Sequence, residues 1–338
     1  MELLKQSFDY DSKALLGRGA FANVYRGTRL SDQCSVAVKF MEKPRSSSRD
    51  YQEKIETMRR ELNIMQSLDH PDVVELLGKF EDTASCIIVQ ELVPGGELFD
   101  YLTEKETLEE IVAMEFIKQL LGVLHYLHAT LRVMHLDIKP ENLLLNADHT
   151  KLKLIDFGLA HHYDPSKPLK KMIGTPEFLS PEICSFDAIT PVTDIWAMGV
   201  LTYIMLTGYS PYLGDDDQET IGNVSQNEPP DFDDEEITTA LSEDSLDFLK
   251  YCLQPSVRKR PTAEQCLGHS WFRPPEDGQV RPSVSLSTKK LRETAAKRRF
   301  RDAARAIRFA NRMSRLSHSL LSPTSPTTTR SESDCLPA

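Results

Sequence analysis

The pattern of apolar and polar positions divides the chain into two parts of different secondary structure. In residues 10–90, short runs of alternating apolar residues predict strands, with one helix among them. In residues 97–272, apolar residues recur every three or four positions over longer stretches and predict mostly helices. A strand-rich part joined to a helical part by a short connector at 91–96 predicts an α+β fold with a cleft between two lobes.

The two periods also predict the individual elements. Strands are expected over the ranges 12–17, 22–30, 35–42, 73–80 and 85–91. One helix is expected over 51–68, and it ends before Pro71 because a residue that precedes proline disfavours the helical region. The helices of the second part are expected over 97–103, 108–129, 190–208, 217–225, 242–253 and 262–268.

Beyond residue 272 the composition changes. Residues 273–288 contain proline and serine and predict a linker, residues 289–320 are basic and predict a helix, and residues 321–338 are rich in Ser, Thr and Pro and predict disorder. Residues 289–315 carry eleven Lys or Arg against two acidic residues, a net of +9, which leaves −20 for the rest of a chain whose total is −11. We therefore expect the body to prefer basic substrates and the tail to fold back onto it or bind an acidic partner.

Several protein classes are not favoured by the composition. No apolar run reaches the ~18 residues of a membrane helix, and the first residues, MELLKQSFDYD, lack the basic and apolar regions of a signal peptide. The six cysteines are scattered without zinc-site spacing, which is typical of reduced thiols. We expect a cytoplasmic protein without stable membrane insertion and without a nucleic-acid partner.

The first candidate for chemistry is the stretch GRGAFANV at residues 17–24. Its two glycines lie between predicted strands, where they permit a tight turn that brings backbone N–H groups close to phosphates. A plain hairpin has the same pattern, so this stretch alone decides nothing. Further on, Lys39 follows the apolar residues of VAVK, and a buried lysine needs a partner. Glu61 in the predicted helix is the candidate, and the pair would hold the ammonium at the α- and β-phosphates of a nucleotide.

The stretch HLDIKPEN at 135–142 supplies further candidates. Asp137 is placed to accept a proton from a substrate hydroxyl, and Lys139 to neutralise the transferring phosphoryl group. Asn142, together with Asp156 of the DFG sequence fourteen residues later, is a candidate magnesium ligand. GTPEF at 174–178 and SPE at 180–182 follow, and Arg260 comes later in the chain.

Taken in order and spacing, these motifs make residues 10–272 resemble the protein kinases. GTPEF and GGELFDYL resemble the calcium/calmodulin-regulated group, and HLDIKPEN, DFGLAH and the insert KPRSSSRDYQEKIETMRRE resemble the death-associated protein kinases. The resemblance implies a bilobal kinase fold: a β-rich N-lobe (10–90) with one main helix, a hinge (91–96), a helical C-lobe (97–272) and a C-terminal regulatory helix. It also implies a serine/threonine kinase that uses ATP and Mg²⁺, with calcium acting only through calmodulin.

By position, the resemblance assigns roles to individual residues. Asp137 is the base, Asn142 and Asp156 bind the metal, and Lys139, Lys39 and Glu61 complete the catalytic set. The implied nucleotide contacts are Leu16, Gly17, Arg18, Gly19, Ala20, Phe21, Ala22, Asn23, Val24, Lys39, Glu91, Val93, Glu97, Glu141 and Asp156. Glu97 and Glu141 are also expected to line the groove upstream of the acceptor hydroxyl and to favour substrates with Arg or Lys there.

The chain departs from the family pattern at a few positions. Gln90 lies where an apolar residue is expected behind the adenine pocket. Ser180 replaces the Ala of A-P-E, and the resemblance implies that Glu182 of this motif still pairs with Arg260. The insert before the N-lobe helix, associated in the family with dimers or partner docking, carries only three basic residues, so a homodimer stays an open expectation. Leu136 replaces the Arg that grips an activation-loop phosphate, and Ser166 is the only Ser or Thr in 161–173. We therefore expect phosphorylation there not to be the switch, and restraint to come from elsewhere.

The tail is the candidate restraint. On a helix its apolar residues share one broad face between arginines: Phe300, Ala304, Ile307 and Met313. A basic amphipathic helix is typical of a calmodulin target or a membrane-surface segment. We expect it to lie across the acidic substrate groove until calcium-loaded calmodulin removes it. Ser283 and Ser285 are candidate inhibitory autophosphorylation sites.

Other interpretations remain. The tail helix is also compatible with plain packing on the C-lobe, with a nuclear-import signal in KRRFR, with membrane-surface binding, or with a role in localisation alone. The body is also compatible with a pseudokinase scaffold that binds nucleotide and partners without turnover, against which the intact Lys39, Asp137, Asn142 and Asp156 argue. The resemblance implies cell-death, autophagy or cytoskeletal signalling, with myosin regulatory light chain as a substrate and a cytoskeletal association.

Overall fold

The computed structural model describes residues 2–18, 22–44, 46–105, 107–226, 228–232, 241–273, 285–290, 292–293 and 296. The chain divides into two units after Arg292, and the elements below all lie in the first unit.

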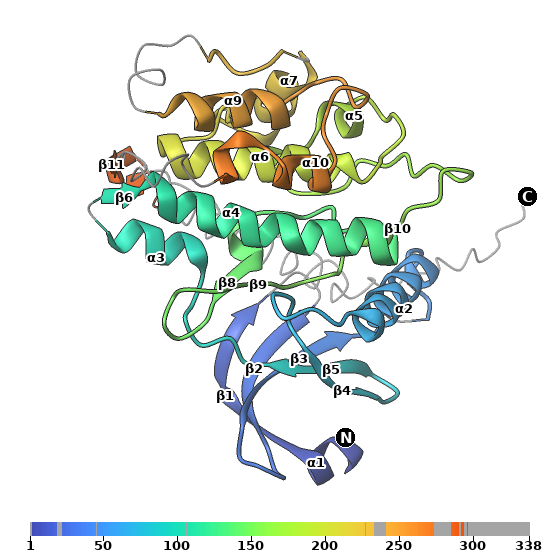
Figure 1. Ribbon diagram of the computed structural model, residues 1–338. Coiled ribbons are helices and arrows are strands. Elements are labelled where there is room, and N and C mark those ends of the chain that lie inside the picture. The colour runs from blue at the N-terminus through green and yellow to red at the C-terminus, as the bar shows by residue number, and fades with distance from the viewer. Residues whose placement is uncertain are drawn as a thin grey trace, which may run out of the picture. The chain divides into compact units, whose positions relative to one another are not determined.

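The N-lobe is built on an antiparallel five-stranded sheet (Figure 1). Its strands, in spatial order, are β1 (Phe8–Arg18), β2 (Ala22–Arg29), β3 (Ser35–Glu42), β5 (Ser85–Glu91) and β4 (Leu76–Glu81). A short helix, α1 (Glu2–Ser7), precedes the sheet, and α2 (Tyr51–Ser67) is the one long helix of this lobe. One core of the sheet consists of Leu4, Phe8, Val36, Val38, Ile87 and Val89, contributed by α1, β1, β3 and β5.

The C-lobe is mainly helical. Its helices are α3 (Leu98–Glu104), α4 (Glu110–His125), α5 (Pro181–Cys184), α6 (Val192–Thr207), α7 (Asp217–Ser225), α9 (Glu243–Cys252) and α10 (Ala263–Leu267). Helix α6 is buried from Thr193 to Leu206, as expected for a helix that is apolar on all sides. None of the helices described is long and apolar enough to cross a membrane.

Short strands and turns of the C-lobe carry the loops that face the N-lobe. The strands are β7 (Val133–Met134), β8 (Leu143–Leu145), β9 (Leu152–Leu154) and β10 (His161–His162), paired β8 with β9 and β7 with β10. Single 3-10 turns lie at Pro140–Asn142, Pro176–Phe178 and Ser270–Phe272.

The α+β bilobal fold predicted from the sequence is confirmed, and several of the predicted elements differ from the observed ones at their ends. β1 begins at Phe8 rather than residue 12, because its first residues pair with β2 up to Arg29. β4 begins at Leu76 rather than residue 73, because Val73 instead bridges to Leu154 of β9. The helix predicted over 108–129 ends as α4 at His125 and continues as a π-helical turn at Tyr126–Leu131.

A strand also occurs inside the predicted linker 273–288. β11 (Ser285–Ser287) pairs antiparallel with β6 (Thr107–Glu109), a three-residue strand that precedes α4. Thr288, which is 2% exposed, donates its hydroxyl to the carbonyl of Lys105. The ammonium of Lys290 lies 5.2 Å from the ring centroid of Tyr209. The start of the tail is therefore held on the C-lobe by backbone pairing, which the composition of a linker does not predict.

The buried hydroxyl of Ser180 gives a stability prediction. Ser180 is 0% exposed, and its Oγ has no hydrogen-bond partner within the described residues. Because an unsatisfied buried hydroxyl is costly, we expect Ser180→Ala to raise the free energy of unfolding by about 1 kcal/mol. Thr202→Val is the matched control: its Oγ1 donates to the Met198 carbonyl at 2.8 Å, so that variant should lose stability in the same urea titration. A loss of stability in Ser180→Ala would contradict this account.

Candidate functional site

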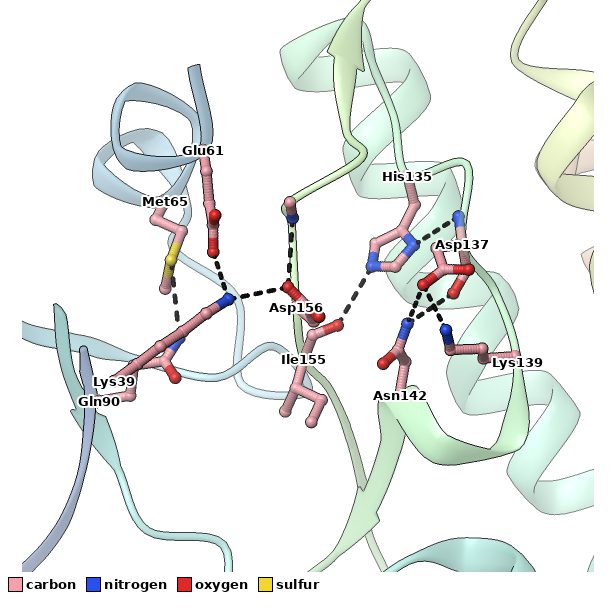
Figure 2. Close-up of polar contacts among 11 residues, drawn as sticks. Lys39, Glu61, Met65, Gln90, His135, Asp137, Lys139, Asn142, Ile155 and Asp156 are labelled. Carbon is pink, nitrogen blue, oxygen red and sulfur yellow. Dashed lines mark hydrogen bonds and ion pairs between the residues drawn. The ribbon is translucent and has the colours of Figure 1, made fainter. Parts of the chain in front are cut away.

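Three charged side chains from distant parts of the chain meet where the two lobes face each other (Figure 2). Lys39 of β3 places its Nζ 2.6 Å from Oε1 of Glu61 on α2 and 3.0 Å from Oδ1 of Asp156, which follows β9. The sequence-predicted pairing of Lys39 with Glu61 is therefore confirmed. Glu61 is only 4% exposed, so this pair lies inside the protein, whereas the Asp156 side chain is 46% exposed.

The trio is electrostatically matched. Burial alone would lower the pKa of Lys39, but the charges and hydrogen bonds of Glu61 and Asp156 outweigh it and raise that pKa. Burial alone would likewise raise the pKa of Asp156, but the Lys39 ammonium and the Gly158 N–H hold it below its usual value. Lys39 is thus a permanent cation and Asp156 a permanent anion at neutral pH, as phosphate and metal binding require.

The catalytic-loop residues form a second polar group around Asp137. Its Oδ1 accepts the hydroxyl of Thr175 at 2.8 Å, and its Oδ2 lies 2.7 Å from Nζ of Lys139 and 3.0 Å from Nδ2 of Asn142. Lys139 also donates to Thr175 Oγ1 at 3.2 Å. These contacts orient the carboxylate. The sequence analysis gave Thr175 no role; its place in GTPEF was the only signal.

A buried carboxylate holds the backbone of this loop. Asp194 of α6 accepts the N–H groups of His135 and Leu136, both at 2.8 Å, and contacts Nε2 of His128 at 2.8 Å. Leu136 has φ +63°, a left-handed conformation that costs a residue with a Cβ about 1–2 kcal/mol. Burial would raise the pKa of Asp194, but His128 and the backbone donors lower it, so the carboxylate stays ionised and holds the strained turn.

The loop between β1 and β2 is described only in part. Gly17 pairs with Val24 and Arg18 with Asn23, and Arg18 Nε donates to Asn23 Oδ1 at 3.2 Å. Leu16 is 48% exposed. Ala22 begins β2. Three predicted nucleotide contacts, Gly19, Ala20 and Phe21, lie outside the described residues.

The remaining predicted nucleotide contacts are half-buried. The carboxylate of Glu91 is engaged within the protein, since it pairs with the ammonium of Lys153 and accepts the Glu75 N–H at 2.9 Å. Val93 follows in the connector, Glu97 bridges to Leu144 at the start of α3, and Glu141 lies in the turn after Lys139. Because its carboxylate already has two partners, Glu91 is expected to meet a nucleotide through its backbone.

Gln90 lies beside the trio but faces α2. Its Nε2 is 3.6 Å from Sδ of Met65, a weak polar contact behind the Lys39–Glu61 pair (Figure 2). The amide therefore ties β5 to α2, where the sequence analysis expected an apolar residue.

Asn142 and Asp156 suit a magnesium ion. Hard oxygen donors are what Mg²⁺ prefers, and it commonly takes only one or two from the protein and the rest from phosphates and water. Nδ2 of Asn142 donates to the Asp137 carbonyl at 2.7 Å, which leaves its amide oxygen for another partner. No group of three or more metal-binding His, Cys, Asp or Glu side chains occurs in the part of the chain that the structure describes. The donor set fits a metal held jointly with nucleotide phosphates.

The tail residues singled out from the sequence cannot be placed. Ser283 and the four apolar positions of the predicted amphipathic helix lie outside the described residues: Phe300, Ala304, Ile307 and Met313. Of Ser285 only the backbone, in β11, is described.

Comparison with known proteins agrees with this geometry. The family model described as protein kinase domain matches residues 10–272. Death-associated protein kinase 2 of Homo sapiens is 37% identical over 311 residues, covering 90% of this chain and 83% of that protein. Myosin light chain kinase 2 of Rattus norvegicus is 36% identical over 320 residues, covering 94% of this chain and 51% of that protein.

A further relative, death-associated protein kinase dapk-1 of Caenorhabditis elegans, is 40% identical over 273 residues, covering 80% of this chain and 19% of that protein. The family match spans both lobes and every residue of the Lys39 and Asp137 groups. A protein of this family uses ATP and Mg²⁺ and acts on protein substrates. The chain belongs to the protein kinase family, as a serine/threonine kinase of the group that includes the death-associated and myosin light chain kinases.

Proposed function

We propose that this kinase phosphorylates Ser or Thr in proteins with basic residues near the acceptor, that its C-terminal segment restrains it, and that calcium-loaded calmodulin relieves the restraint. The observation that carries the catalytic part is the joint arrangement of Lys39, Glu61 and Asp156 with Asp137. A pseudokinase scaffold would have no need for four charged groups held at these distances.

The polar groups account for phosphoryl transfer. The acceptor hydroxyl oxygen bonds to the γ-phosphorus as its proton passes to Asp137, and the bond to the β–γ bridging oxygen breaks with ADP as the leaving group. Lys139, 2.7 Å from Asp137, neutralises charge on the transferring group, and Lys39 binds the α- and β-phosphates. Asn142 and Asp156 would hold a magnesium ion, which would supply charge neutralisation for the phosphates.

The substrate preference follows from charge. The rest of the chain carries a net −20 when the basic segment 289–315 is set apart. Glu97 at the start of α3 and Glu141 beside the catalytic loop are half-buried acids near the place where a peptide would pass Asp137. Opposite charge at short range favours Arg or Lys in the peptide.

The same charge balance supports restraint by the tail. A segment with net +9 is attracted to an acidic groove, and its apolar positions from Phe300 to Met313 suit a calmodulin groove. The strand pairing of β11 and the burial of Thr288 hold the start of the tail on the C-lobe, which raises the local concentration of the basic segment. Ser283 and Ser285 stay candidate inhibitory autophosphorylation sites. Modification of Ser285 would require β11 to leave β6, since kinases need an accessible, extended acceptor.

The test compares three proteins: the full chain, a chain ending at Arg273, and the full chain with Ile307→Glu. We expect the shortened chain to have about tenfold higher basal activity towards a basic Ser peptide, because competition by a tethered inhibitor is lost. It should not respond to calcium and calmodulin. The full chain should be activated by them, and Ile307→Glu should weaken that activation. Equal basal activity of the full and shortened chains, with no calmodulin response, would exclude the model.

The cellular setting is part of the proposal. Relatives named for cell death and for myosin light chain make cytoplasmic signalling in cell death, autophagy or the cytoskeleton the setting that fits best. Phosphorylation of purified myosin regulatory light chain by the calmodulin-activated chain tests the cytoskeletal branch.

A further inference from the structure

The side chain of Leu136, which replaces an arginine, lies in an apolar cluster, while its backbone N–H is held by Asp194. It is 5% exposed. The buried members of this Leu136 cluster are Met134, Leu136, Ile173, Leu179, Ile183 and Ile189. Partly buried residues packed against them are Leu159, Tyr163, Leu169, Cys184 and Ile221. None of these side chains is charged at neutral pH.

The cluster reaches the activation segment (residues 159–173) along its length. Leu159 lies at its start, Tyr163 and Leu169 lie within it, and Ile173 lies at its end. Leu136 also lines a small apolar pocket together with Ile173 and the residues that follow it. The catalytic loop and the activation segment thus share one hydrophobic core around Leu136. An arginine at this position would have needed an anionic partner.

Backbone contacts reinforce this packing. β10 of the activation segment pairs with β7, the Tyr163 N–H donates to the Arg132 carbonyl at 2.7 Å, and the Ile189 N–H donates to the Leu169 carbonyl at 2.9 Å. Gly174, at φ +118°, passes so close that an added Cβ would lie 3.2 Å from the Leu136 carbonyl oxygen. The segment is therefore closely apposed to Leu136 immediately before Thr175.

Two basic side chains join the activation segment to α2. Arg60 of α2 donates its Nε to the Ala160 carbonyl at 2.9 Å, and Lys171 pairs with Glu53. Burial lowers the pKa of His161, so its ring is neutral at pH 7. Arg60 and Lys171 therefore tie the two ends of the segment to α2 without a phosphate.

We propose that Leu136 is a positioning residue that holds the activation segment in its substrate-binding conformation by apolar packing, without a phosphate. The segment leads directly into Thr175, whose hydroxyl orients Asp137 at 2.8 Å. Loosening the Leu136 cluster would therefore disturb peptide binding and the base. It would leave the Lys39–Glu61–Asp156 trio, and hence ATP binding, unchanged.

The test uses Leu136→Ala, Leu136→Met and Leu249→Ala in the full chain under identical conditions, so its result does not depend on whether the tail is inhibitory. In Leu136→Ala we expect kcat/KM for a basic Ser peptide to fall about tenfold, because removing a buried side chain costs packing that the segment needs. KM for ATP should change by no more than about twofold, a difference close to zero in binding free energy, because the Lys39–Glu61–Asp156 trio is left unchanged. Amide hydrogen exchange over 159–173 should speed up, and Leu136→Met should restore both, because Met fills a similar volume.

Two further arms separate local from general effects. Leu249, 0% exposed on α9, is a matched buried leucine away from the segment, so Leu249→Ala should lower the melting temperature without changing the peptide KM or exchange over 159–173. Phosphatase treatment should not lower the wild-type activity, and Ser166→Ala should leave it unchanged. The proposal is overturned if Leu136→Ala behaves like Leu249→Ala, or if phosphatase abolishes the activity.

Discussion

Replacing Asp137 by asparagine is expected to lower kcat by roughly 10²–10⁴-fold, the usual contribution of a positioned acid–base group. The amide keeps the size of the carboxylate, so the loop should stay folded. The amide of the variant cannot take the proton of the acceptor hydroxyl. It also has only one acceptor oxygen, whereas Asp137 has two: one accepts from Thr175, and the other contacts Lys139 and Asn142. KM for ATP should be nearly unchanged, since Lys39 and Asp156 are untouched.

The measurement is steady-state phosphate transfer to a basic Ser peptide, with ATP binding followed separately by the shift in melting temperature on adding ATP and Mg²⁺. Asp148→Asn, an exposed aspartate in the turn between β8 and β9, is the matched control and should keep wild-type kcat. If Asp137→Asn kept kcat within about threefold, well below the effect of a general base, the assignment of Asp137 would be wrong.

The sequence predicted the parts of the fold and site that depend on local pattern. The ends of β3, β5 and α7 agree with the apolar periods because each is a regular segment bounded by turn residues. The Lys39–Glu61 pair was predictable because a lysine in an apolar strand must find an anion, and α2 offered one on its buried face.

Other features depend on tertiary contacts that no local pattern carries. The Glu91–Lys153 pair joins residues 62 positions apart, and nothing near Glu91 indicates it. β11 is a three-residue strand, too short to show a period, and it is defined only by its pairing with β6, which lies far away in the sequence. The missing arginine at Leu136 was visible in the sequence, but the apolar cluster that takes its place needed the positions of Leu169 and Ile173 in space.

Removing either partner of the buried Glu182–Arg260 pair is expected to lower the free energy of unfolding by roughly 3–5 kcal/mol, because an unpaired charge would remain inside the protein. The sequence-predicted pairing is confirmed as a two-bonded contact: Nη1 to Oε1 at 2.7 Å and Nη2 to Oε2 at 2.9 Å, with both residues 4% exposed. Thr193 donates to Oε1 at 2.7 Å, and Arg260 lies over the Trp196 ring at 5.0 Å. Urea unfolding followed by tryptophan fluorescence measures the loss.

The two variants should differ in their pH dependence. In the native protein, burial would raise the pKa of Glu182, but Arg260 and Thr193 hold it below its usual value. Ionised Glu182 therefore contributes its full stabilisation at any pH above the pKa that Glu182 has in the unfolded chain. This stabilisation is lost only as the pH falls through the lower pKa that Glu182 has in the folded protein. In Arg260→Met the isolated carboxylate should have a raised pKa, so the stability deficit should grow as pH rises from 5 to 8. In Glu182→Ala the guanidinium stays charged throughout, so that deficit should be constant over this range.

An exposed ion pair serves as the control that shows whether the loss of stability depends on burial. Lys43 and Glu81 lie 2.6 Å apart, but the Glu81 side chain is 67% exposed, so Glu81→Ala should cost less than about 1 kcal/mol. A deficit in Arg260→Met that stayed level between pH 5 and 8 would mean that Glu182 is solvated or finds another cation once Arg260 is gone. The Glu182–Arg260 pair would then orient α5 against the segment after α9, but Arg260 would not be needed to compensate a buried charge. The test distinguishes these roles because only an uncompensated buried carboxylate takes up a proton between pH 5 and 8.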